Sequence, residues 1–443
     1  MRYANTILLG TLAFNLLLDH FFLVEGLPFV NGLKALSLLL LLFFAGIGKE
    51  SKRLGDGSLF VFIIYLSLFL LGVCLLPFSE SPESSIYSII VYLTKVLMFF
   101  GCVSICLSKK WFDTEPLIKI WVVLGMIFAS QAIAHAVFLY FLRTEPTYYA
   151  VYLPRLKETR YISWCGQGFP GSFTRPSSFF TEANDLAQFL FAPMFLSLAS
   201  GSKWRYLVSA VILLGLVSCM SFAATFAVII GLILYSLTQI RIPFLRPVLM
   251  LGGIIAISFS AWGTVEMFTQ TETNDADYVR LQLFGRQRSV EDKQHMLLYG
   301  FRAANINPIG IGFIRKEDSR EFGYRKQFNS ASGLMTILIH FGYVGFMAYL
   351  VQWLLVGYLF LKFAKRVRAG TADKRGLALG TAFISIVIAS LTHTPFDERI
   401  YVLTLAWFLV YCRQYRVLLP WTVDRSYPSG APTRAVPLLG KAR

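Results

Sequence analysis

A run of polar residues, 172–185, leads directly into an apolar segment long enough to span a membrane. Within it, Arg175 could bind a phosphate through two hydrogen bonds, and Asn184 stands where a helix would begin, a position that favours an anion. Glu182 and Asp185 could each act as a general base, or could instead cap the helix and complement its dipole. The pattern predicts an anion-binding site at a helix start, with two candidate bases.

A second group of candidate residues lies in 266–330, which holds ten Lys and Arg residues. The favoured ligand is a lipid-linked phosphate or diphosphate, held by two or three of these cations. Arg286 and Arg288 come first because they precede a predicted helix, and Arg302 comes next. The alternative is a surface that attracts anionic lipid headgroups. The ten cations are Arg280, Arg286, Arg288, Lys293, Arg302, Arg315, Lys316, Arg320, Arg325 and Lys326.

Inside this basic segment, residues 289–305 are expected to form a helix, because Ser289 and Asp292 have the spacing of a capping box. The helix should stop before Asn307-Pro308. The next residues form a turn in which Gly310 and Gly312 would let the backbone approach a ligand closely.

Histidines are the remaining candidates for proton transfer. His135 lies in an apolar segment, where an ionisable residue is a functional candidate by default, although a hydrogen-bonded structural role is the alternative. His295 lies in the basic segment and would share a helix face with Arg302. The nucleotide-binding and tight metal-binding motifs are absent from the sequence, so neither a cofactor nor a metal is expected.

The composition indicates that membrane-spanning helices position these residues. The chain has 443 residues, of which 56% are hydrophobic and 15% charged, too little charge to cover a soluble surface. We therefore expect an all-α polytopic membrane protein, not a nucleic-acid-binding protein, despite the net charge of +16. About twelve spans fit: 4–24, 30–47, 58–77, 86–107, 117–141, 183–200, 206–220, 222–239, 247–265, 332–361, 376–393 and 399–415.

Orientation follows from the loops, because Lys and Arg fall in alternate short connections. This pattern predicts cytoplasmic termini, a transmembrane domain over 1–416 and a disordered cytoplasmic tail over 417–443. The two long loops, 142–182 and 266–331, would lie on the outer side, and the second would be partly helical. The first apolar run lacks an A-x-A cleavage site, so a retained span is expected there.

Several short motifs together resemble the O-antigen ligase / Wzy polymerase superfamily of bacterial surface-polysaccharide assembly. The resemblance covers most of 160–365. Its residues are Arg175 with Phe179, Phe180 and Asn184-Asp185-Leu186-Ala187; the P-x-x-G-x-G-like stretch Pro308-Ile309-Gly310-Ile311-Gly312; and Asn329-Ser330 followed by Gly342-Tyr343-Val344-Gly345.

The resemblance implies a metal-independent glycosyltransferase at the outer face of the bacterial inner membrane. Its donor would be an undecaprenyl diphosphate-linked oligosaccharide, whose diphosphate the outer arginines bind. Arg175 is the best match to the family pattern, whereas the family's arginine early in the large loop falls on Lys293, near Arg286 and Arg288. Asn329, with Ser330, matches the polar dipeptide of the family pattern. Membrane lipid, a chain-length regulator and a flippase are candidate partners, and nucleic acid is not.

One departure separates the members of this superfamily. Ligases carry a His-Asn pair at the end of the large loop, where this chain has Phe328-Asn329 and no histidine before His340. That favours a polymerase acting in O-antigen or exopolysaccharide synthesis at the cell envelope. The alternatives are a ligase joining glycan to lipid A-core, which would need His295; a transporter or flippase, which would need charges within spans and repeated halves; and a non-enzymatic assembly factor.

Overall fold

The computed structural model describes residues 56–78, 82–108, 115–140, 183–219, 221–239, 300–312, 333–392, 399–417 and 419. All regular structure in these ranges is helical. The helices are α3 (Asp56–Leu75), the 3-10 helix η1 (Leu76–Phe78), α4 (Pro82–Ser108), α5 (Glu115–Tyr140), α9 (Ala183–Ala199), α10 (Arg205–Ser218), α11 (Phe222–Gln239), α15 (Gly333–Arg368), α16 (Lys374–Thr392) and α17 (Arg399–Gln414).

Each labelled α-helix coincides with one of the expected spans. The segment 206–239 forms two helices, α10 and α11, and Cys219 is in a turn at the end of the first. The remaining expected spans, 4–24, 30–47 and 247–265, lie outside the described residues, as do the proposed loop 142–182 and most of the tail 417–443. Val417 and Leu419 are buried, so the packed part of the chain continues just past α17.

Among the helices that the structure describes, four are long and apolar enough to cross a membrane: Gly57–Leu75, Glu115–Val137, Thr336–Arg368 and Lys374–Leu391. Large apolar side chains are exposed along α3, α5, α10 and α15, among them Ile63, Val123, Leu214 and Leu354. Apolar surface on four helices at once is more than a soluble protein normally exposes to water, whereas it suits contact with lipid chains. The fold is that of a membrane-embedded helical protein.

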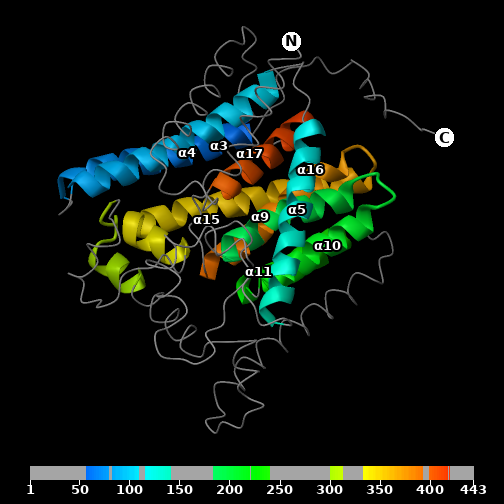
Figure 1. Ribbon diagram of the computed structural model, residues 1–443. Helices are drawn as coiled ribbons and strands as arrows, with labels where there is room; N and C mark the ends of the chain where they lie inside the picture. Colours follow the sequence, from blue (N-terminus) through cyan, green and yellow to red (C-terminus); the bar gives the residue numbers. More distant parts are fainter. Residues whose placement is uncertain are drawn as a thin grey trace, which may run out of the picture.

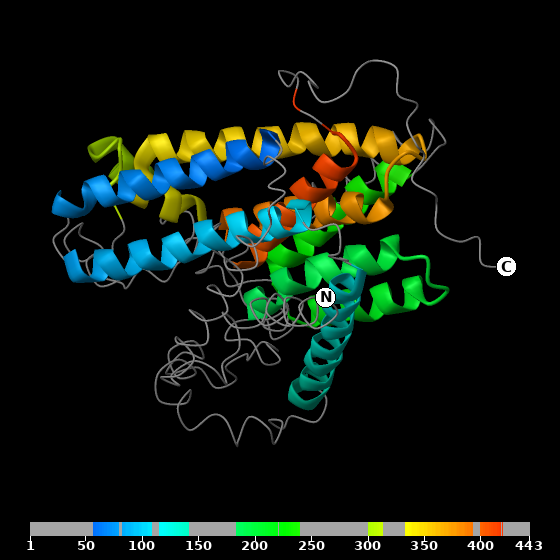
Figure 2. The same ribbon diagram turned by 90° about the horizontal axis from the view of Figure 1, so that it is seen from above.

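Some neighbouring helices are antiparallel, as the ring and glycine contacts between them show. Phe383 and Gly380 of α16 meet Tyr401 and Phe408 of α17, so these helices are antiparallel. Figures 1 and 2 show most helices running along one common direction, with α5 crossing them steeply.

One end of the bundle collects basic residues. Arg368 Nε, near the end of α15, donates to the carbonyl oxygen of Thr238 at the end of α11 over 3.2 Å. Arg366 Nη1 donates to the carbonyl oxygen of Tyr415, just past α17, over 2.5 Å. Arg375 at the start of α16 forms an ion pair with Glu115 at the start of α5. We call this the basic end, and the opposite one the far end.

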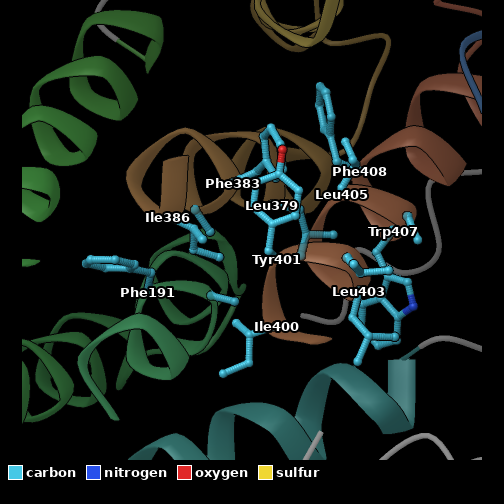
Figure 3. Close-up of a cluster of buried hydrophobic side chains, with 14 of the residues drawn as sticks. Phe191, Leu379, Phe383, Ile386, Ile400, Tyr401, Leu403, Leu405, Trp407 and Phe408 are labelled. Carbon is cyan, nitrogen blue, oxygen red and sulfur yellow. The ribbon is translucent and has the colours of Figure 1, made fainter. Parts of the chain in front are cut away.

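The core lies around α9 and α17, whose described side chains are buried almost throughout. A helix that is apolar on all sides belongs in the interior of a bundle, and both sequences have this character. Figure 3 shows Phe191, Phe383 and Tyr401 among the side chains that fill the space between α9, α16 and α17. The rings of Phe383 and Tyr401 lie 4.9 Å apart.

The helices differ in length, and this difference shapes the far end. The straight part of α15, from Tyr343 to Arg368, and all of α4 are each about 39–40 Å long at 1.5 Å per residue. By the same rise, α9, α10, α11, α16 and α17 measure only about 21–28 Å. In Figure 2, α3, α4 and α15 accordingly extend beyond the others on the left. The start of α9 is therefore recessed relative to these longer helices.

Candidate functional site

The start of α9 carries three buried polar side chains at the far end. Asn184, Asp185 and Gln188 are 2%, 6% and 1% exposed. Among the residues whose side chains the structure describes, Asp185 is the one carboxylate in the buried class. An ionisable side chain in such surroundings is costly, so its presence marks a functional candidate.

A hydrogen bond fixes this polar turn against α16. Gln188 Nε2 donates to Ser390 Oγ over 3.4 Å, although the two residues are 202 positions apart. Asn184 precedes Gln188 by four residues and so shares its face of the helix. The sequence had pointed to Asn184 and Asp185 but missed Gln188 and Ser390. The sequence does contain one signal for Gln188, because its amide side chain stands inside an apolar run, one helical turn after Asn184.

Asp185 lies on another side of α9, the one that meets α5. Phe189, one turn after Asp185, packs against Phe128 with ring centroids 5.5 Å apart and against Trp121 at 6.4 Å. Continuing along α5, His135 comes two turns after Phe128 and is only 1% exposed. Asp185 and His135 therefore both lie beyond the Phe128–Phe189 contact, each on its own helix.

The turn 308–312 is joined to a break in α15 through backbone hydrogen bonds. Ile311 and Gly312 donate to the carbonyl oxygens of Ile339 and His340, each over 3.0 Å, and Tyr343 donates to that of Pro308 over 2.9 Å. At the break, Gly342 has φ 57° and ψ −150°. Backbone groups freed by a broken helix must find partners within a membrane, and the turn supplies them.

Glycine is required on both sides of this junction. A Cβ atom at Gly342 would lie 2.1 Å from the carbonyl oxygen of Pro308, and one at Gly310 would lie 2.4 Å from that of His340. Gly310 and Gly312 also have positive φ angles of 87° and 80°. The close backbone approach expected at this turn is therefore an approach to α15. The two glycine motifs of the resemblance, at 308–312 and 342–345, meet in space.

Arg302 lies just before the junction, on a helical segment at 300–306 that ends where the sequence predicted. Ala303 and Ala304 are buried while Arg302 is exposed, so the segment packs through its alanines and presents the guanidinium outward. Tyr343 Oη donates to Asn305 Oδ1 over 2.5 Å, which ties this segment to α15.

The structure divides the described candidates between two places. Asn184 and Asp185 lie on α9 in the middle of the bundle, with His135 on the adjoining α5, whereas Arg302, Gly310 and Gly312 lie by the ends of α3 and α15; Figures 1 and 2 both separate the segment 300–312 from α9. The other candidates fall outside the described residues, and they are Arg175, Glu182, Arg286, Arg288, Lys293, His295 and Asn329.

A buried hydrogen-bonded group that the sequence did not indicate lies between α15 and α17. Tyr401 Oη accepts from Gln352 Nε2 over 3.3 Å and from Trp353 Nε1 over 3.1 Å. Such bonds join spans to one another in an apolar medium. This group holds α17 against α15.

In chemical terms, the far end offers a buried carboxylate with amide neighbours, a histidine on the adjoining helix and an exposed guanidinium. These groups can transfer a proton and bind an anion. Within the described ranges, no three His, Cys, Asp or Glu side chains are placed to hold a metal ion. No family model and no curated protein matches the chain.

Proposed function

We propose that this chain is a Wzy-type polysaccharide polymerase of the bacterial inner membrane. It would transfer glycan from an undecaprenyl diphosphate carrier to a lipid-linked repeat unit at the outer face. The proposal includes twelve spans, two outer loops and cytoplasmic termini, so that the basic end faces the cytoplasm. The motif resemblance suggests the reaction class. The assignment of the site depends on one observation, the buried carboxylate of Asp185 at the far end.

The depth of Asp185 supports a substrate that is borne by lipid. Asp185 is 14 residues from the end of α9, or about 21 Å above the basic end at the helical rise. The hydrocarbon layer is about 30 Å thick, so this carboxylate lies below the outer headgroups. A soluble substrate would have to descend into the membrane to reach it, whereas a carrier lipid already places its diphosphate near this level.

The second support is the cation of Arg302, which lies farther from the basic end than Asp185. Arg302 lies beside the Gly342 break, which is about 39 Å from the end of α15 and so close to the outer headgroups. An exposed guanidinium at that height could bind the diphosphate of a lipid-linked substrate. The separation of Arg302 from Asp185 then suits the acceptor, whose own diphosphate is joined to the opposite end of the repeat unit from its reacting hydroxyl.

The proposed reaction displaces the carrier from the sugar. Asp185 takes the proton of the acceptor hydroxyl, and the oxygen forms a bond to the anomeric carbon while the bond from that carbon to the carrier diphosphate breaks. The electron pair leaves with the diphosphate, whose developing charge is stabilised by a cation of the outer loops, Arg175 being the first candidate because it precedes α9 in the chain, while Arg302 holds the diphosphate of the lipid-linked acceptor. Asn184 and Gln188 hold sugar hydroxyls.

The test replaces Asp185 in a strain lacking the chromosomal copy, with surface glycan resolved by length on a gel. Asp185→Asn keeps the shape and removes the base, so we expect single repeat units where the wild type makes long chains, a loss of at least about 100-fold in polymer. Asp185→Glu should retain part of the activity.

The matched control is Asp373→Asn, which changes a partly buried aspartate at the basic end. It should leave chain length unchanged at equal membrane abundance. Long chains accumulating on the carrier and absent from the lipid core would indicate a ligase. An unchanged glycan profile with Asp185→Asn would rule out the site.

A further inference from the structure

A surface at the basic end combines exposed aromatic rings with cations. It consists of residues 200–207, the turn between α9 and α10 together with the first turn of α10. Trp204, Tyr206 and Leu207 are 58%, 65% and 57% exposed. Large apolar side chains so exposed normally have a partner. We call this surface the α9–α10 turn.

Each of the two aromatic rings carries a cation. Lys203 Nζ lies 5.7 Å from the ring centre of Trp204, and the Arg205 guanidinium lies 4.6 Å from that of Tyr206. Arg205 Nη2 also donates to Tyr206 Oη over 2.8 Å. Cations within about 6 Å of a ring face are attracted to it. The rings thus hold both charges at the surface in defined positions.

The turn itself is ordered by short-range hydrogen bonds. Trp204 N donates to Ser202 Oγ and Arg205 N donates to the carbonyl oxygen of Ser202, each over 3.2 Å. This tight turn presents Trp204 and Tyr206 outward before anything binds, so little conformational entropy is lost when a ligand arrives.

The exposed face of α10 shows how the surface meets the membrane. Leu207, Ala210, Leu214 and Val217 are all exposed, and their 3-4-3 spacing places them on one stripe of the helix. Along α10 the surface therefore passes from exposed aliphatic residues to a mixed group of aromatic rings and cations, which alternate over 203–206. Aliphatic residues followed by aromatic rings and cations match the boundary between the lipid chains and the headgroups of a leaflet.

We propose that the α9–α10 turn binds the headgroup of an anionic phospholipid, with Lys203 and Arg205 on the phosphate and Trp204 and Tyr206 at the glycerol level. The charge around it favours this partner. The basic end also presents Lys362 over the ring of Tyr358 at 4.6 Å, as well as exposed Lys365. This surface is remote from Asp185, so the inference is independent of the proposed polymerase activity.

The test is native mass spectrometry of the purified full-length chain. The protein is reconstituted in nanodiscs of phosphatidylcholine with phosphatidylglycerol, extracted into mild detergent, and the retained lipids are counted. We expect phosphatidylglycerol to be retained in preference. The double variant Lys203→Gln/Arg205→Gln should lower the ratio of retained phosphatidylglycerol to phosphatidylcholine by about five-fold for each charge removed.

The control variant is Lys119→Gln, which removes an exposed cation, 72% accessible, from the start of α5. It should leave the lipid ratio unchanged. The same loss per charge removed in both variants would mean that net charge alone acts, which overturns the proposal. An unchanged ratio in the double variant also overturns it and would assign these cations to a protein partner.

A second measurement covers the case in which the double variant does not purify. Trp204→Phe keeps the charges and removes one indole, so its fluorescence difference from the wild type reports Trp204 alone. A headgroup-labelled phosphatidylglycerol quencher should reduce this difference signal more than the same label on phosphatidylcholine. Equal quenching by the two lipids would contradict specific binding.

Discussion

The backbone N–H of Tyr343 bonds to the carbonyl oxygen of Pro308 over 2.9 Å, so the break in α15 is bridged by a segment that precedes it in the chain. A broken helix inside a membrane protein leaves backbone groups without partners unless another segment supplies them. Here the turn 308–312 does so, and Gly342 is the residue that makes the approach possible.

We therefore expect Gly342→Ala to destabilise the protein. The new Cβ would lie 2.1 Å from the Pro308 carbonyl oxygen, and a φ of 57° with a ψ of −150° is a conformation that side chains disfavour. The expected loss is at least about 2 kcal/mol, measured as a lower unfolding temperature of the purified protein in detergent. Gly357→Ala in the same helix is the control, because nothing lies within 4 Å of its Cβ position. An unshifted unfolding temperature in Gly342→Ala would contradict the junction.

The second prediction concerns the hydrogen bond from Gln188 to Ser390. Gln188→Leu and Ser390→Ala should each destabilise the bundle, and the double variant should lose less than the sum, with a coupling of about 0.6 kcal/mol and at most about 2. Reversible unfolding of the four proteins in mixed micelles gives the coupling. Strictly additive effects would show that the 3.4 Å contact contributes nothing to stability.

The ion pair between Arg375 and Glu115 should matter more than its neighbour. Arg375→Ala removes a partner that is 28% exposed and joins α16 to α5, while Lys119→Ala removes one that is 72% exposed and lies on the same helix as Glu115. We expect up to about 1 kcal/mol from Arg375→Ala and almost nothing from Lys119→Ala. Unfolding at low and high salt measures both, and the Arg375 effect should shrink as salt screens the charges. Equal effects of the two substitutions would contradict this ranking.

Arg302 should act through the geometry of its guanidinium, if the proposed function is correct. Arg302→Ala should lower the yield of long glycan at least about ten-fold, and Arg302→Lys should restore only part of it, because an ammonium cannot make the paired hydrogen bonds of a guanidinium. Glycan gels at matched membrane abundance provide the measurement. Lys365→Gln at the basic end is the control, and full activity of Arg302→Ala would remove Arg302 from the site.

The positions of the helices could be predicted from the sequence, because each is a run of apolar residues bounded by polar or basic ones. The start of α9 at Ala183 and the turn between α10 and α11 near Ser221 are both visible in this way. The break at Gly342 was not predicted. Nothing in the local pattern G-Y-V-G interrupts a helix, and only the distant turn 308–312 makes the break stable.

The candidate site was predicted in part for the same reason. Asn184 and Asp185 stand out as polar residues at the start of an apolar run, and their burial agrees with that interpretation. Ser390 could not be identified, because a serine in a membrane helix is unremarkable until Gln188 is known to face it. The pairing of Tyr401 with Gln352 and Trp353 likewise depends on packing between helices distant in sequence.

The ion pair between Glu115 and Arg375 has a consequence for biosynthesis. Its members are 260 residues apart, and α16, which carries Arg375 and also Ser390, is among the last helices to leave the ribosome. Until α16 is inserted, the side of α9 that carries Gln188 has no helix against it. The Gln188 amide is then in contact with lipid or with an insertion factor. Chains that stop before residue 374 would leave this side of α9 without the helix that covers it.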